Sequence, residues 1–385
     1  MKQGTTVNNQ NQKQIIMKKL LNQLACLFLA TATFLTACDK EDLPKPPPVV
    51  RPGQEGFFNV KVKASLTVGD VVYDSIPAAL TILGWDRDGV LHRREVALSA
   101  GTNEVQLDKS FVRHQLTMNK WGASAERSLQ KSEVSESTVY ILSATKAAKR
   151  LSSEITYAFQ DGAFQPYKKE EYRYDAQGRL QEISHFDVDP AVPGSALTLS
   201  SVDRLNYSGD RLESIELFDK SDGSDNILGF TEFSYDNSGK MVFKRTASGN
   251  DVYRYQIEHT SQQGTDIIRI NTMGDGALGT GARVDVFFRN GNRIEEHTIA
   301  PNYPTTTKTY TFDNYINPYV HLKNPGIFFE NTSKNNVKEI SMGSATTLRH
   351  NYQYDNDGYI TQVQKAEHNT STGASRLILK TVYTY

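Results

Sequence analysis

The chain has 385 residues, 38% hydrophobic and 23% charged, which is typical of a folded protein long enough for two domains. Its 43 lysines and arginines balance 44 aspartates and glutamates, and the formal net charge of −1 excludes the sustained positive field that nucleic-acid binding requires. Nineteen tyrosines and 17 phenylalanines against two tryptophans and six methionines favour strands, so we expect an all-β fold.

The N-terminal segment has the pattern of a secretory signal peptide. Lys18 and Lys19 precede an apolar run that is short for a membrane-spanning helix, and small residues lead from this run to Cys38. We therefore expect residues 1–37 to be a signal peptide, with Met17 as an alternative start of translation.

Cys26 and Cys38 are the only cysteines of the chain, and both lie in the N-terminal 38 residues. The sequence beyond them therefore has no thiol for a disulfide or for a metal site.

The stretch "LTAC" at the end of the signal resembles the lipobox of bacterial lipoproteins. This resemblance implies that Cys38 becomes the first residue of the mature protein and carries the acyl chains that hold it to a membrane. Lys40, Glu41 and Asp42 follow, and this acidic stretch resembles the export signal of Bacteroidetes lipoproteins that reach the outer face of the outer membrane. We therefore expect a lipid-anchored protein of the outer membrane exposed at the cell surface, with the periplasmic face as the alternative.

Residues 38–55 hold five of the 13 prolines and are predicted to be an extended tether. After the tether, residues 56–145 have the pattern of a small β domain. The stretch "FFNVKVKASLTV" alternates apolar and polar residues, and "AALTILGW" and "VLHRREVAL" flank a hairpin turn that begins at Asp86. A calcium loop opening there would need glutamate at its twelfth position, which is Ala97. The pattern resembles immunoglobulin-like or transthyretin-like modules, which implies a β-sandwich.

Residues 150–385 contain a repeated pattern that "YRYDAQGRLQEIS" illustrates. Two aromatic residues stand two apart, a turn with aspartate and glycine follows, and an apolar strand leaves the turn. The glycines of five copies are Gly178, Gly209, Gly239, Gly291 and Gly358. The first two intervals are 31 and 30 residues, and the longer ones leave room for degenerate copies, so we expect six or seven β-hairpins.

The outgoing strand of each hairpin breaks strict alternation. Leu180 and Ile183 are three residues apart, and so are Ile360 and Val363. Because alternate residues of a strand point to opposite faces, this spacing predicts either a bulge or a strand buried on both faces.

The pattern Tyr-x-Tyr-Asp-x-x-Gly-x-Leu-x-x-Ile resembles the YD repeat of the RHS family, whose hairpins form long curved sheets. The layout as a whole is similar to Bacteroidetes lipoproteins of unassigned function. Since six or seven hairpins are too few to close an RHS shell, we expect an open or partly curled antiparallel sheet. The resemblance implies no enzymatic role.

The tyrosine rows of the repeats have two interpretations. They pack across strands in a core, or they form an aromatic contact surface for sugar rings or peptides. The candidate contact residues are Tyr172, Tyr174, Tyr235, Tyr352 and Tyr354.

No catalytic, cofactor or metal motif is found. Residues 274–279, "GDGALG", match a nucleotide-binding glycine pattern, but the next segment has the pattern of a strand, so no helix N-terminus meets a phosphate. His185, His297 and His368 are isolated and are interpreted as surface or cross-strand residues. The acidic stretch 219–225 is interpreted as a loop, with a surface calcium site as the alternative.

These observations predict a non-catalytic, surface-anchored lipoprotein that binds or displays, with a polysaccharide or host polymer as its partner. The alternative is a structural or accessory subunit of an outer-membrane envelope complex. A glycan hydrolase with unrecognised acidic residues is a further alternative, because two carboxylates can meet without any sequence motif.

Overall fold

The computed structural model describes residues 56–385, except 75, 190–191, 193–194, 222, 274–280, 323–332 and 344. The predicted signal peptide, the tether, Cys38, Lys40, Glu41, Asp42 and residues 274–279 lie outside the described residues. Within the described part, no helix has the length and apolar composition needed to cross a membrane.

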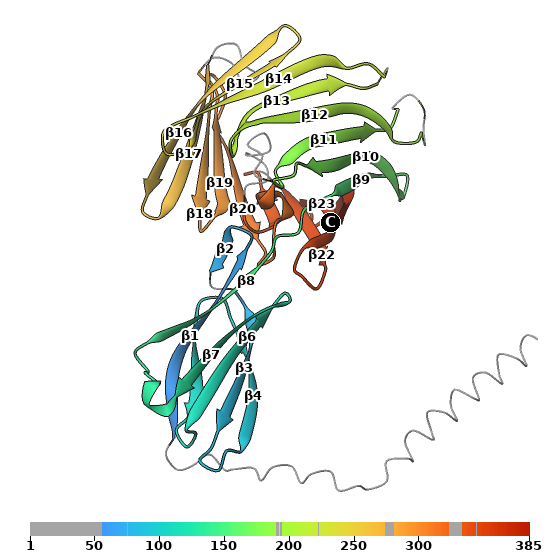
Figure 1. The fold of residues 1–385 in the computed structure, drawn as a ribbon. Coiled ribbons are helices and arrows are strands. Elements are labelled where there is room, and N and C mark those ends of the chain that lie inside the picture. Colours follow the sequence, from blue (N-terminus) through green and yellow to red (C-terminus); the bar gives the residue numbers. More distant parts are fainter. Residues whose placement is uncertain are drawn as a thin grey trace, which may run out of the picture.

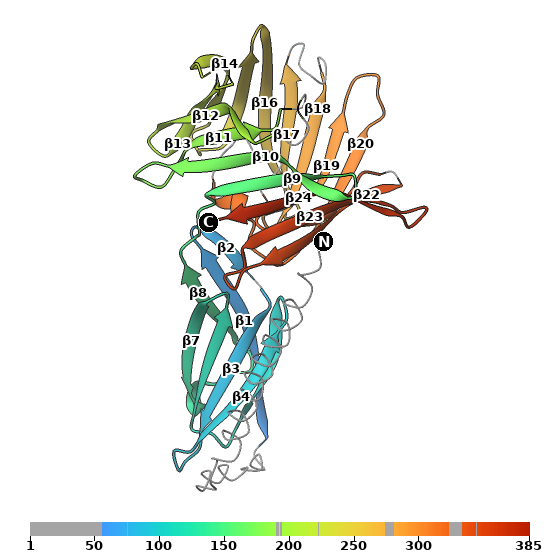
Figure 2. The same cartoon turned by 90° about the vertical axis from the view of Figure 1, so that its right-hand side faces the viewer.

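Residues 57–146 form two four-stranded sheets at one end of the molecule (Figures 1 and 2). The elements are β1 Phe57–Val68, β2 Val71–Asp74, β3 Ala78–Trp85, β4 Leu91–Leu98, β5 Thr102–Asp108, β6 Arg113–Lys120, β7 Ala123–Gln130, η1 Lys131–Glu133 and β8 Val139–Lys146. One sheet has the order β2-β1-β5, with β8 parallel to β1, and the other has the order β4-β3-β6-β7. We call this unit the sandwich.

Alternate residues of β1 supply part of the sandwich core. Val60, Val62, Leu66 and Val68 are fully buried, as the alternation in "FFNVKVKASLTV" indicates. The same core includes Ile316 and Tyr359 from the second half of the chain. The sandwich and the second unit therefore share one apolar cluster.

The second unit is a closed barrel of 16 antiparallel strands. Its strands are β9 Ser153–Gln160, β10 Ala163–Tyr174, β11 Leu180–Asp187, β12 Thr198–Ser208, β13 Arg211–Asp219, β14 Asn226–Tyr235, β15 Met241–Ser248, β16 Asp251–Gln262, β17 Thr265–Met273, β18 Arg283–Arg289, β19 Asn292–Ile299, β20 Thr306–Phe312, β21 Val337–Ser341, β22 Thr346–Tyr354, β23 Ile360–Asn369 and β24 Ser375–Thr384. Figure 2 shows β24 beside β9, the pairing that closes the barrel.

The chain is all-β, but the predicted open or partly curled sheet is wrong. The last strand pairs with the first in six registered positions, from Leu379 opposite Ala158 to Thr384 opposite Ser153. Bulges add local twist and bend to a strand, and they recur beside the glycine turns, so the curvature accumulates until the edges meet.

The predicted bulge after the turn is confirmed. Tyr172 pairs with Ile183 and Tyr174 pairs with Leu180, which leaves one extra residue on β11. Leu180 and Ile183 therefore both face the interior despite their spacing of three.

The glycine turns lie at the sandwich end of the barrel, where the connection from β20 to β21 also folds inward. That connection includes η2 Pro318–His321, and Leu322 joins the apolar cluster of the barrel. Lys146 Nζ donates hydrogen bonds to the carbonyls of Trp121, at 2.8 Å, and Asp357, at 3.1 Å. The sandwich therefore contacts the turn that contains Asp357 and Gly358 directly.

Candidate functional site in the barrel lumen

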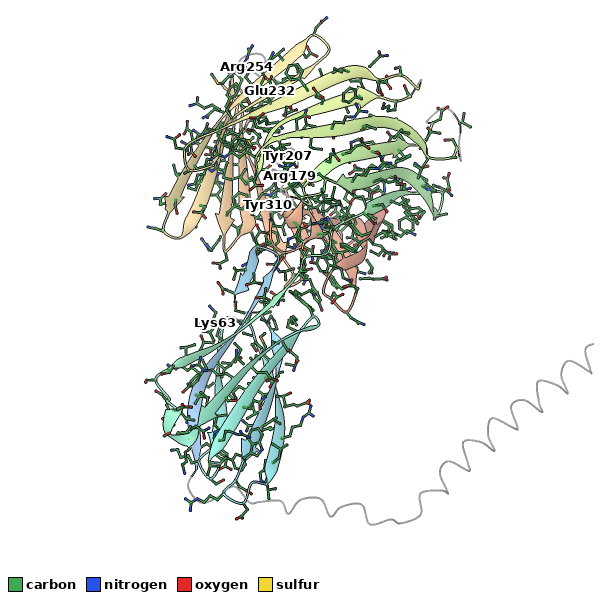
Figure 3. The ribbon with its side chains drawn as sticks, viewed as in Figure 1. Lys63, Arg179, Tyr207, Glu232, Arg254 and Tyr310 are labelled. Atoms are coloured by element: carbon green, nitrogen blue, oxygen red, sulfur yellow. The ribbon has the colours of Figure 1, made fainter. Side chains whose placement is uncertain are left out.

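The outer face of the barrel wall is charged. Glu232, Arg245 and Arg254 stand opposite one another on β14, β15 and β16, and Figure 3 shows two of them. Arg245 Nη1 lies 2.9 Å from Glu232 Oε2. Further ion pairs on this face join Arg173 to Glu182, Arg269 to Asp285, and Arg349 to Glu339. Barrels that cross a membrane present an apolar belt, and each arginine or lysine at mid-bilayer costs about 2–4 kcal/mol, so this outer face is suited to water.

The inner face is apolar at the sandwich end, and we call this part the floor. Its cluster consists of Leu151, Tyr172, Leu180, Ile183, Leu205, Leu212, Phe233, Met241, Ile257, Ile270, Val286 and Leu322. These side chains come from both halves of the barrel. They pack into one cluster, which borders the cavity through Ile270 and Val286.

A regular set of tyrosine hydrogen bonds ties neighbouring hairpins together at the floor. The Tyr207 hydroxyl donates to the Leu180 carbonyl of the preceding hairpin at 2.7 Å, and the Tyr235 hydroxyl donates to Leu212 at 2.8 Å. Arg179, the residue before Leu180, lies over the Tyr207 ring at 4.7 Å (Figure 3). In these two repeats the second tyrosine of the pattern therefore links one hairpin to the one before it.

The structure places the five candidate contact tyrosines on the inner side, with their hydroxyls bonded within the protein. Tyr172 donates to Glu170, Tyr174 to the Leu151 carbonyl, Tyr235 to the Leu212 carbonyl, Tyr352 to the Val337 carbonyl and Tyr354 to Asp313. Tyr352 also lines the cavity described next. Contact of these residues with a ligand stays a prediction.

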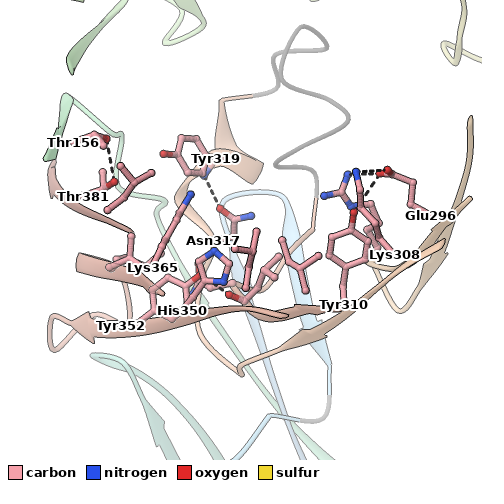
Figure 4. A pocket seen from close by; sticks show the side chains of 18 of the residues that line it. Thr156, Glu296, Lys308, Tyr310, Asn317, Tyr319, His350, Tyr352, Lys365 and Thr381 are labelled. Atoms are coloured by element: carbon pink, nitrogen blue, oxygen red, sulfur yellow. Dashed lines mark hydrogen bonds and ion pairs between the residues drawn. The ribbon is translucent and has the colours of Figure 1, made fainter. Parts of the chain in front are cut away.

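Beyond the floor the barrel holds a cavity of about 750 Å³. Its wall includes side chains from β9, β10, β15 to β24 and the connection that carries η2. Figure 4 shows Glu296, Lys308 and Tyr310 on one side, and Lys365, His350 and Tyr319 on the other. Each of these six side chains has a polar or ionisable group, and apolar side chains such as Val284 and Leu348 complete the wall, so the cavity differs from the floor by its charged groups.

One side of the cavity is organised around Glu296. Its carboxylate accepts hydrogen bonds from Lys308 Nζ at 2.8 Å, the Tyr310 hydroxyl at 3.2 Å and Arg293 Nη1 at 3.3 Å. Burial alone would raise the pKa of Glu296, but the bonds and charges of Lys308 and Arg293 lower it below its ordinary value. Glu296 therefore stays ionised and holds two cations at the wall.

The opposite side contains Glu154, a buried carboxyl on β9. The Tyr319 hydroxyl, from η2, donates a hydrogen bond to it. Burial raises the pKa of Glu154, the negative charge of Glu170 raises it further, and the result is about 7. Glu154 is therefore partly neutral near neutral pH.

A second acidic group lies beside Glu154. Glu170 is bonded by Lys168 Nζ at 3.1 Å and by the Tyr172 hydroxyl at 2.8 Å, and His185 lies 3.7 Å away. His185 Nε2 also contacts Asp203 at 3.1 Å. Burial would lower the pKa of His185, but its bonds to Asp203 and Glu170 raise it to about 9, so this histidine is cationic.

The sequence interpretation missed this polar lumen. His185 was expected at the surface or across strands, and it is a cross-strand residue: it lies opposite Glu170 of β10 and contacts Asp203 of β12, both on the inner wall. The available signal was that inward positions on several strands are ionisable, such as Lys168 and Glu170 on β10. Among the described residues, no three His, Cys, Asp or Glu side chains are grouped in a way that could hold a metal ion.

No family model matches the chain, and no curated protein matches it. Among solved structures, the chain is similar to a porin-like protein from Bacteroides uniformis ATCC 8492, with 12% identity, 61% of this chain and 96% of that chain covered, and a TM-score of 0.42. A porin-like protein from Bacteroides vulgatus ATCC 8482 is also 12% identical, with 60% and 97% covered and a TM-score of 0.35. Similarities at this level carry no argument about function, so the architecture rests on the strand pairing.

The closed barrel overturns the predicted role of a surface module that binds or displays a polymer on an exposed sheet. That role needed an open face with accessible tyrosine rows, and the sheet closes with those rows inside. A barrel fold is consistent with an outer-membrane location. Lipid attachment at Cys38 and exposure at the cell surface stay predictions.

Proposed function

We propose that this protein is held at the outer membrane through a lipid on Cys38 and that its barrel admits small solutes from water into a chamber with a closed floor. The observation that carries the proposal is the cavity of about 750 Å³ inside a closed barrel, whose wall mixes charged and apolar side chains and borders the apolar floor. Cavities of this volume fall in the range that accommodates small molecules.

The floor favours a chamber over a pore. Leu151 and Leu180 are 1% exposed and Leu212 is 3% exposed, and they pack with residues from the opposite wall. The sandwich then covers the same end through contacts at Trp121 and Asp357. A solute that enters the lumen would therefore leave by the way it came.

The outer face favours a lipid anchor over a barrel that crosses the bilayer. Its cross-strand ion pairs, such as Arg245 with Glu232, would lose their hydration in hydrocarbon. Acyl chains on Cys38 would hold the protein at the membrane while the barrel stays in water.

We also propose that the hairpins are YD-type repeats. Support comes from the positive φ of all five repeat glycines and from the tyrosine bonds that link Tyr207 and Tyr235 to the preceding hairpins.

Cysteine labelling tests the chamber, in a full-length background with Cys26→Ser and Cys38→Ser. Val284→Cys places a thiol on the lumen wall and Leu180→Cys places one in the floor. We expect a small methanethiosulfonate reagent to label position 284 in the folded protein and to leave position 180 unlabelled. The matched exposed control is Asn206→Cys, which should label fastest.

A lumen thiol at position 284 that stays unreactive while position 206 labels would contradict solute entry. A steady conductance when the wild-type protein is added to a planar bilayer would contradict the closed floor and establish a pore instead.

A further inference from the structure

One side of the outer face differs from the rest of the barrel. It lies where the wall closes, on β23, β24, β9 and β10, which Figure 2 shows side by side. Thr156 and Thr381 point into the lumen, where their hydroxyls are bonded at 3.0 Å, so the residues next to them in the strand point outward. The outward residues, which we call the seam face, are Gln362 and Gln364 on β23, Lys380 and Val382 on β24, Ile155, Tyr157 and Phe159 on β9, and Phe164 and Pro166 on β10.

Aromatic and aliphatic side chains dominate the seam face. Phe159 and Phe164 are cross-strand neighbours with ring centroids 5.1 Å apart, and Phe159 is 36% exposed. Val382 lies opposite Ile155 on the next strand. These strands therefore present apolar groups to their surroundings, which is typical of a surface that meets an apolar partner.

The seam face has one charged residue, Lys380. Its Nζ lies over the Tyr157 ring at 4.4 Å and over the Phe164 ring at 5.0 Å. Among the described residues, no carboxylate forms an ion pair with Lys380, and Glu171, farther along the outer side of β10, is paired with Lys169. The seam face therefore combines aromatic rings with one positive charge that no carboxylate neutralises.

The opposite side of the barrel excludes a bilayer that surrounds the whole wall. β16 is half of the strand order away from β9, and its Arg254 lies in a row with Arg245 and Glu232. These charges would lose their hydration in hydrocarbon. An apolar partner can therefore contact the barrel only from one side.

The chain before the sandwich is long enough to let the barrel reach a membrane. β1 begins at Phe57, and at its other end a Cβ atom on Gly69 would lie 3.6 Å from His321 of the barrel unit. The sandwich thus separates the start of β1 from the barrel by roughly 40 Å. Residues 38–55 can span up to about 60 Å, so a lipid on Cys38 would not hold the barrel away from the bilayer.

A second copy of this chain fits the seam face less well than a membrane does. A two-fold dimer places the same patch on both partners. Each Lys380 would then be buried against a face without a carboxylate, and burial of an unpaired charge is costly. Anionic lipid headgroups supply the missing negative charge.

We propose that the seam face docks on the headgroup region of the membrane, with Lys380 at anionic headgroups and the rings of Tyr157 and Phe159 at the boundary with the acyl chains. Aromatic residues and lysines favour this boundary, because their apolar parts leave water while their polar ends stay hydrated. The docking rests on the proposed function, because the lipid on Cys38 brings the membrane within reach and allows a small patch to suffice.

Fluorescent reporters on the lipid-anchored full chain test which side of the barrel meets the bilayer. Gln364→Cys places a thiol on the seam face and keeps its aromatic residues, and Arg254→Cys is the matched site on the opposite side. The background is Cys26→Ser, in which an acylated Cys38 has no free thiol. Each protein carries an NBD dye and is incorporated in vesicles of phosphatidylethanolamine and phosphatidylglycerol with a spin-labelled lipid as quencher. We expect quenching at position 364 to be at least about threefold stronger than at position 254.

Two variants that carry the reporter at position 364 separate charge from apolar contact. Lys380→Gln should weaken the quenching at least about twofold on vesicles with phosphatidylglycerol and leave it unchanged on phosphatidylcholine alone. Phe159→Ser should weaken it on both compositions, because apolar burial does not depend on headgroup charge. Ile227→Ser is the control, since Ile227 is 61% exposed on β14, outside the seam face, and the quenching should stay the same.

Equal quenching at positions 364 and 254 in vesicle-bound protein would overturn the docking and leave the proposed lipid anchor intact. Dye labelling of the Cys26→Ser background at Cys38, without attachment to vesicles, would contradict the anchor and the docking together. A blue-shifted emission at position 364 without vesicles, accompanied by a dimer in sedimentation, would show that a second copy covers the seam face and would also overturn the docking.

Discussion

The two ends of the barrel use the same strands for different purposes. On β10, Tyr172 and Glu170 stand two residues apart and both face inward, yet Tyr172 belongs to the apolar floor and Glu170 to the ionised group of the lumen. At the floor, the hydroxyls of Tyr207 and Tyr235 are bonded to backbone carbonyls of the preceding hairpin. In the lumen, charged groups surround a cavity, and acceptors of Asn336 and His350 lack partners.

Along each strand, the residues near the glycine turn hold neighbouring hairpins together, and the residues farther along line the lumen. The positions close to the glycine turn recur from hairpin to hairpin, because each one must close against its neighbour. The positions farther along the strand differ between hairpins, since they need only face the lumen. The repeats are therefore the scaffold, and the inward residues beyond them make the site.

The largest effect on stability is expected from a substitution at Gly358, in the turn that contacts the sandwich. Gly358 has φ of +83°, and a Cβ atom there would lie 2.5 Å from the Trp121 ring. Gly358→Ala should lower the free energy of unfolding by about 2–4 kcal/mol, because the strain of a positive φ adds to overpacking against the indole. Urea unfolding followed by tryptophan fluorescence measures the change.

Gly162 at the opposite end of the barrel is the matched control. It has nearly the same φ, +82°, with nothing within 4 Å of an added Cβ, so Gly162→Ala should cost only the backbone strain, about 1–2 kcal/mol. Equal costs at the two glycines would show that the Trp121 ring does not pack against the turn at Gly358.

The sequence predicted local features of the floor because they depend on neighbouring residues. The glycines at positive φ and the bulge that brings Leu180 and Ile183 to one face follow from turn and strand geometry within about a dozen residues. Closure did not follow, because it depends on β24 meeting β9, where Val382 lies opposite Ile155. No local pattern encodes a pairing between residues so distant in the sequence.

The lumen was harder to predict for the same reason. Glu154, Glu296 and His350 come from three different strands, and each is an isolated polar residue in its own segment. In an open sheet, a single glutamate on this face would be exposed to water, and nothing in its own segment would mark it as a site residue. The β9–β10 hairpin already places Glu154 opposite Glu170, and burial together with the charge of Glu170 raises the pKa of Glu154.

A variant of Glu154 tests the lumen in the same way, through the pH dependence of stability. Its pKa is raised from the ordinary value of 4.5 to about 7, so the fold favours the protonated carboxyl. Stability contributed by the protonated group is present below pH 4.5 and is lost as the pH rises toward and through 7. Glu154→Gln has no proton to lose at this position, so the variant avoids this loss. Relative to the wild type, its free energy of unfolding should be higher at pH 8 than at pH 4.5 by on the order of 1–3 kcal/mol.

Denaturant unfolding at the two pH values measures that difference. Glu216→Gln, a substitution on the outer face of β13, is the matched control and should show no comparable dependence. His185, whose pKa is raised from 6.5 to about 9, also loses stabilisation above pH 6.5, and this loss is common to the wild type and both variants, so it cancels in the comparison. If Glu154→Gln and Glu216→Gln changed stability equally at both pH values, burial of Glu154 would not be responsible.

The smallest effect is expected from the loss of a single tyrosine hydrogen bond at the floor. Tyr207→Phe removes only the hydroxyl that donates to the Leu180 carbonyl at 2.7 Å, and the ring keeps its contact with Arg179. We expect a loss of about 0.5–1.5 kcal/mol in the free energy of unfolding, since the carbonyl loses its side-chain partner.

Tyr303→Phe is the control, because Tyr303 is 76% exposed and should change stability by less than about 0.5 kcal/mol. Tyr235→Phe removes the equivalent bond one hairpin later, so its cost should match that of Tyr207→Phe. A cost at position 207 no greater than that at position 303 would mean that apolar packing, and not the tyrosine bonds, joins the repeats.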